Sequence, residues 1–132
     1  MNEKTIQKLI SLAKNTTQHS YSPNSNYKVG AVLLTKSGNI FSGTNIENAS
    51  FPAGMCAERV AIFKAISEGY KDFKTLTIYA EGKHFPYPCG ICRQVIVEFT
   101  TDLPIIIAKS QKEYVIKNIS ELLPSAFELN IK

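Results

Sequence analysis

Hydrophobic residues recur along this chain at spacings that predict four helical segments. Near the amino terminus, Ile6, Leu9, Ile10 and Ala13 lie three or four positions apart, which indicates an amphipathic helix over about residues 3–16. Three further helical segments are expected: one that begins near Met55 or Cys56 and stops at Gly69, one over Cys92–Phe99, and a short turn over Ser120–Leu123.

Short runs of aliphatic, β-branched and aromatic residues lie between these helices and predict strands. A hairpin is expected from two such runs joined by the turn Lys36-Ser37-Gly38-Asn39. The five expected strands are Val29–Thr35, Ile40–Gly43, Thr75–Ala80, Pro104–Ala108 and Tyr114–Ile116. Because helices and strands alternate, the pattern predicts one α/β domain over residues 1–132, with a sheet covered by helices on both faces.

Composition places the chain among ordinary globular proteins. Its 132 residues are 44% hydrophobic and 20% charged, so a real core is expected and no metal or disulfide is needed merely for folding. No apolar run approaches the ~18 residues of a membrane helix, and the start lacks a secretory pattern. We therefore expect a cytoplasmic protein without membrane contact.

The charge is positive but dispersed. Lysine and arginine exceed aspartate and glutamate by 15 to 11, which gives a net charge of +4. The lysines form no block, and a surface of this kind is usually only solvated. We expect no nucleic-acid partner.

Three cysteines carry the candidate chemistry, in Cys56-Ala57-Glu58-Arg59 and in Pro88-Cys89-Gly90-Ile91-Cys92. An odd number of cysteines without an export signal argues against a disulfide framework. Each motif stands at the predicted start of a helix, where the helix dipole favours a thiolate. Three thiolates suit Zn²⁺, and three protein ligands with water as the fourth is the arrangement of catalytic zinc.

Other interpretations of these residues remain open at this point. An isolated C-x-x-C also fits a redox pair, and either His19 or His84 can complete a structural zinc site with the three cysteines. Glu58 is either a first-turn acid favoured by the dipole or a carboxylate that moves protons beside the metal. The order of a first ligand, then x-Glu, then P-C-x-x-C matches the pattern of zinc deaminases with Glu58 as general acid/base.

These motifs together resemble those of the small homotetrameric cytidine deaminases, and the resemblance covers nearly the whole chain. The segments that carry it are Tyr27–Ala31, Asn45–Ser50, Cys56–Arg59, Pro88–Val95 and Leu122–Phe127. It implies a three-layer α/β/α sandwich with one mixed, roughly five-stranded sheet. It also implies Zn²⁺-dependent hydrolysis of cytidine and deoxycytidine to uridine, deoxyuridine and ammonia in pyrimidine salvage.

The resemblance further implies roles for individual residues. Cys56, Cys89 and Cys92 would hold one zinc ion per subunit, with Glu58 moving the protons and Arg59 hydrogen-bonding the thiolates. The substrate would be bound by the side chains of Asn45 and Glu47 at the ribose, the Ala57 N–H at the pyrimidine, and the aromatic rings of Tyr27 and a neighbouring subunit's Phe127. A homotetramer with shared active sites is therefore expected.

This chain departs from the family pattern at two positions. Phe51 stands where tyrosine is usual, and Asn24 stands where an aromatic residue is common. Neither belongs to the metal set, so the departures concern substrate affinity and loop packing.

Three other functions remain to be distinguished from cytidine deamination. The chain is alternatively a deaminase of another cytosine nucleoside such as an antibiotic, a deaminase of a base within RNA or DNA, or a zinc-stabilised module without activity. Asn45 and Glu47 in the free-nucleoside pattern, without a basic block for phosphates, argue against a nucleic-acid substrate. Release of ammonia from cytidine would exclude the inactive module.

Overall fold

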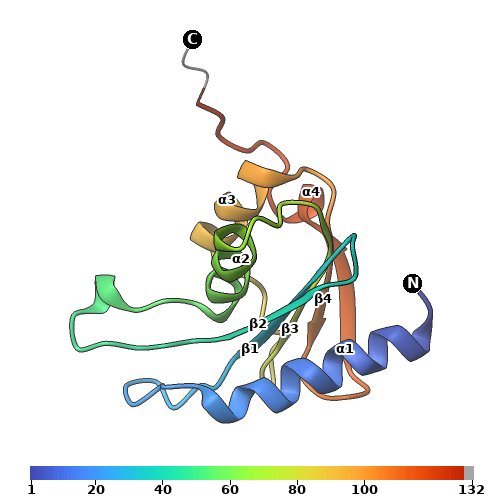
Figure 1. The fold of residues 1–132 in the computed structure, drawn as a ribbon. Coiled ribbons are helices and arrows are strands. Elements are labelled where there is room, and N and C mark those ends of the chain that lie inside the picture. Colours follow the sequence, from blue (N-terminus) through green and yellow to red (C-terminus); the bar gives the residue numbers. More distant parts are fainter. Residues whose placement is uncertain (130–132) are drawn as a thin grey trace.

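A single mixed sheet of five strands forms the middle layer of the protein (Figure 1). The computed structural model describes residues 1–129. The strands are β1 (Gly30–Thr35), β2 (Ile40–Thr44), β3 (Phe73–Tyr79), β4 (Pro104–Ala108) and β5 (Tyr114–Asn118), in the spatial order β2-β1-β3-β4-β5. Only β3 and β4 pair in parallel, and the other neighbours are antiparallel.

Helices cover both faces of the sheet, so the predicted three-layer α/β/α sandwich with one mixed sheet is confirmed. Helix α1 (Glu3–Thr16) lies on one face, while α2 (Ala57–Ser67), α3 (Gly90–Phe99) and α4 (Ile119–Leu122) lie on the other (Figure 1). The two cores divide by strand alternation: Leu33 of β1 packs toward α2, and Val32 packs toward α1. Both faces are buried, which explains the nearly continuous apolar strands.

The amino termini of helices α2 and α3 lie close together, and a cysteine is the N-cap residue of each helix. Cys56 is the N-cap of α2 and Cys89 is the N-cap of α3. The backbone N–H of Cys92 donates to Cys89 Sγ over 3.4 Å. This cap explains why α3 begins at Gly90, two residues before the predicted start.

Other differences from the sequence prediction are small. Two short 3-10 helices, Thr17–His19 and Phe51–Ala53, lie in segments without a helical pattern. Strand β3 begins at Phe73 and not at Thr75, because Phe73 pairs with Thr35 beyond a register shift in β1. Within residues 1–129 no helix is long and apolar enough to span a bilayer.

Candidate active site

The three cysteines predicted to bind metal come together at the adjoining helix ends. Their Sγ atoms all lie within 4.8 Å of one another, and those of Cys56 and Cys89 are 3.7 Å apart. Cys92 is buried, Cys56 half-buried and Cys89 exposed. In the part of the chain that the structure describes, neither His19 nor His84 belongs to this group of potential ligands. The geometry thus favours a three-ligand site over the four-ligand alternative.

The charges around the thiols suit a bound cation. Hydrogen bonding with Cys92 and then with Arg59 and Cys89 lowers the pKa of Cys56 to about 5. The hydrogen bond with Cys56, together with burial, raises the pKa of Cys92. Arg59 Nη2 donates to Cys56 Sγ over 3.4 Å. One thiolate and two neighbouring sulfurs in so small a space form a soft donor set that a divalent zinc ion fits.

Glu58 lies beside the three thiols but does not belong to the group of potential metal ligands. Its side chain is 5% exposed, and burial raises the pKa of its carboxyl to about 7, with a further upward contribution from the charge of Cys56. The carboxyl can therefore both accept and donate a proton near neutral pH.

A cavity of about 340 Å³ lies next to Glu58, and four of the residues predicted to bind the substrate line it. Tyr27, Asn45, Glu47 and Ala57 all line it. The pKa of Tyr27 is raised, by burial first and by the nearby charge of Glu58 second. The volume of the cavity suits a small molecule, and its lining combines polar side chains with the aromatic ring of Tyr27, which can contact a flat face of that molecule.

Asn45 and Glu47 are held in place by the loop that follows α1. Asn45 Oδ1 accepts hydrogen bonds from Ser20 Oγ at 2.5 Å and from Val29 N at 3.0 Å, and its Nδ2 donates to the Tyr27 carbonyl over 2.7 Å. Glu47 accepts from the backbone N–H groups of Asn24 and Ser25, at 2.8 and 3.1 Å, and from the Ser25 hydroxyl. The Ser25 hydroxyl, followed by the two backbone donors, lowers the pKa of Glu47 despite some opposing desolvation. The carboxylate is therefore oriented and charged.

Phe127, which is predicted to bind the substrate, and Phe51, one of the two departures from the family pattern, both lie outside this cavity. Phe127 is 66% exposed and does not line the cavity, and its carbonyl accepts a hydrogen bond from Gln94 Nε2 at 3.0 Å. Phe51 is 78% exposed and lines an adjoining cavity of about 400 Å³, which also reaches Asn24 and Arg59. Both positions that depart from the family pattern thus meet in this second cavity.

The structure adds cavity residues that the sequence did not single out. Pro86 and Tyr87 form part of the wall, together with Ser25, Val29 and Ile78. The prolines before Cys89 predicted a loop, but only the fold reveals that this loop returns to the site. Proximity to the cysteine motif was the single indication available in the sequence.

Comparison with known proteins agrees with this site. Residues 3–108 match the model of the cytidine and deoxycytidylate deaminase zinc-binding region. A probable cytidine deaminase of Dictyostelium discoideum is 41% identical over 128 residues, 96% of this chain and 86% of that protein. A cytidine deaminase of Halalkalibacterium halodurans is 43% identical over 122 residues, 92% of each chain.

A solved structure is similar as well. The crystal structure of cytidine deaminase from Burkholderia pseudomallei superposes with a TM-score of 0.88 and 38% identity, covering 96% of this chain and all of that one. The fold and the thiol site define a zinc-dependent α/β enzyme. This chain belongs to the cytidine and deoxycytidylate deaminase family, and its cofactor is Zn²⁺.

Proposed function

We propose that this protein is a cytidine deaminase that hydrolyses cytidine and deoxycytidine to uridine and deoxyuridine, with release of ammonia. The observation that carries the proposal is the position of Glu58, buried beside three thiols and at the wall of a nucleoside-sized cavity. We further propose that this reaction serves pyrimidine salvage and that the protein acts in the cytoplasm.

Cys56, Cys89 and Cys92 are the proposed zinc ligands. Bound there, Zn²⁺ supplies Lewis-acid chemistry that makes water nucleophilic near neutral pH. Three thiolates around a divalent ion leave one net negative charge, which weakens that chemistry. Arg59 offsets the excess by drawing electron density from the Cys56 sulfur through its hydrogen bond.

Glu58 is the proposed general acid/base. Its carboxylate takes a proton from the attacking water and transfers it to N3 of the pyrimidine. It then takes the second proton from the hydroxyl that the water has become on C4 and delivers it to the leaving amine. A carboxyl with a pKa of about 7 can perform both halves of this transfer. The water oxygen becomes the C4 oxygen of the product, and the amine leaves as ammonia.

The remaining cavity residues position the substrate. Asn45 and Glu47 bind the ribose hydroxyls, the Ala57 N–H contacts the pyrimidine, and the Tyr27 ring forms one wall against the base. Phe127 is proposed to supply a second aromatic wall to a neighbouring subunit, within a homotetramer. Its exposed ring supports this assignment, because it is available for contact outside its own chain.

The test is ammonia release by the purified zinc-loaded protein from cytidine, deoxycytidine and a cytosine-containing antibiotic nucleoside. We expect the first two to be turned over, and Glu58→Ala to reduce kcat by at least about a thousandfold while zinc remains bound. Glu68→Ala is the matched control, since Glu68 is an exposed acid at the other end of α2.

The outcomes separate the candidate functions. Turnover of the antibiotic alone would reassign the substrate, and no ammonia from any substrate would leave a zinc-stabilised module. Near-native turnover by Glu58→Ala would remove Glu58 from the mechanism.

A further inference from the structure

One wall of the substrate cavity is built by a segment without regular secondary structure. Residues 80–89 connect β3 to α3, and Pro86, Tyr87 and Cys89 from this segment line the cavity. Its first and last residues are held by a hydrogen bond from Ala80 N to the Ala108 carbonyl and by one from Arg93 N to the Cys89 carbonyl, but the residues between them belong to no strand or helix. Its position must come from contacts with other parts of the chain.

Lys109 makes these contacts from the end of β4. Its Nζ donates to the Lys83 carbonyl over 3.4 Å and lies 4.8 Å from the centroid of the Phe85 ring. The ring itself is partly buried against the core beneath α2 and α3. The Lys109 side chain is only 21% exposed, so both contacts are partly shielded from water.

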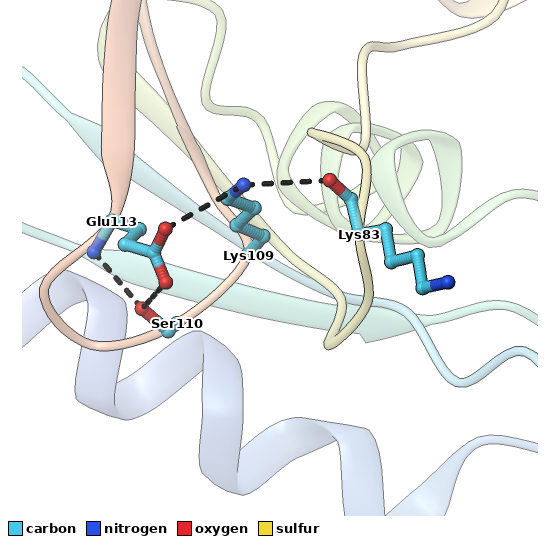
Figure 2. Close-up of polar contacts among 4 residues, drawn as sticks. All are labelled: Lys83, Lys109, Ser110 and Glu113. Carbon is cyan, nitrogen blue, oxygen red and sulfur yellow. Dashed lines mark hydrogen bonds and ion pairs between the residues drawn. The ribbon is translucent and has the colours of Figure 1, made fainter.

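Lys109 is in turn held by an ion pair with Glu113. Figure 2 shows the Lys109 ammonium between the Glu113 carboxylate and the Lys83 carbonyl, while the Lys83 side chain extends away from this group. The distance from Lys109 Nζ to Glu113 Oε2 is 3.5 Å. Glu113 is fixed by its backbone N–H to Ser110 Oγ, at 3.0 Å, and by its carbonyl to Lys109 N, also at 3.0 Å.

Two other side chains contact the ends of the segment: Tyr79 Oη donates to Glu81 Oε1 over 3.2 Å, and Arg93 Nε donates to the Pro88 carbonyl over 2.7 Å. In its central part, residues 82–87, Lys109 is the one residue from elsewhere in the described chain, residues 1–129, whose side chain donates a hydrogen bond. We propose that Lys109 is a positioning residue, which holds the wall formed by Pro86 and Tyr87 at the correct distance from the substrate. The inference rests on the proposed deaminase function and places Lys109 away from the reacting atoms.

Lys109→Met removes the ammonium and keeps the length of the side chain. We expect KM for cytidine to rise about five- to tenfold, with kcat within about twofold and zinc content unchanged, because the loosened wall weakens binding of the base. Lys109→Arg retains the charge, the donor and the contact with the ring. It should keep KM within about twofold of the unsubstituted protein.

Lys83→Met is the matched control. It removes one positive charge from the same group of residues but leaves the Lys83 carbonyl, which is the atom that Lys109 contacts. We expect native kinetics. If Lys83→Met raised KM as much as Lys109→Met, a general effect of net charge would explain the result and the proposal would be wrong.

Hydrogen exchange gives a readout that needs no turnover. Lys109→Met should speed amide exchange in residues 82–87 about tenfold or more and leave the strands unchanged. Unchanged exchange there would overturn the proposal, whatever the kinetics. Turnover of cytidine by the unsubstituted protein tests the proposed function separately, so the two hypotheses fail in different experiments.

Discussion

Arg59 is the one cation that touches the thiol cluster in the described chain. Its Nη2 binds Cys56 Sγ, while its Nε is buried without a hydrogen-bond partner among residues 1–129. A guanidinium placed in this way favours the thiolate form of Cys56. Since protons compete with zinc for thiolates, we predict that Arg59 lowers the pH at which the metal is lost.

Arg59→Gln tests this directly. The arginine lowers the pKa of Cys56, so without it the thiol gains a proton at a higher pH and zinc should be released at a higher pH. A shift of about one pH unit corresponds to a contribution of about 1.4 kcal/mol. The measurement is zinc release against pH with a chromogenic chelator, and Arg59→Lys should shift the midpoint less. Superimposable release curves would make Arg59 an ordinary partly buried arginine.

The sequence predicts the residues that carry the chemistry of the site, but it predicts few of the residues that only line the cavity. The three cysteines and Glu58 are predicted from their types and spacings, which carry chemical meaning, whereas Asn45 and Glu47 are predicted from the family resemblance. Tyr87 and Ser25 were not, because a loop tyrosine or serine has no distinctive pattern. Their place in the cavity depends on long-range folding that local spacing does not encode.

Among the elements, α2 determines where Cys56 and Glu58 stand, and its position depends on close contact with β2. Gly43 makes that contact possible: a Cβ there would lie 2.6 Å from both the Ala57 carbonyl oxygen and the Ala61 nitrogen. These are backbone atoms of the first turns of α2, so they cannot give way without moving the helix. The buried strand pattern predicted β2, but it gave no indication of this close approach.

Gly43→Ala should therefore displace the amino terminus of α2. We expect the free energy of unfolding to fall by about 1–3 kcal/mol and zinc affinity to decrease, because Cys56 moves with the helix. Gly90→Ala is the control at the start of α3, where an added Cβ would meet nothing within 4 Å. Thermal unfolding and zinc titration measure both effects. Equal behaviour of the two variants would show that β2 and α2 tolerate the added carbon.

At the scale of the whole molecule, Tyr27 and Tyr87 line the cavity, whereas among residues 1–129 no aromatic side chain near the carboxyl terminus does so. Phe127 and Leu129 are exposed at 66% and 70%. Both side chains are therefore available for contact with another subunit. A closed tetramer with dihedral symmetry would bury them and bring each Phe127 to another subunit's site.

Sedimentation and kinetics together test this assembly. We expect a species of four 14.7-kDa chains, and we expect Phe127→Ala to raise KM for cytidine about tenfold because stacking on the base is lost. Ile116→Ala, at an exposed position on the edge strand β5, is the control and should keep native KM. A fully active monomer would refute the shared site. A tetramer in which Phe127→Ala keeps native KM and kcat would retain the assembly and remove Phe127 from substrate binding.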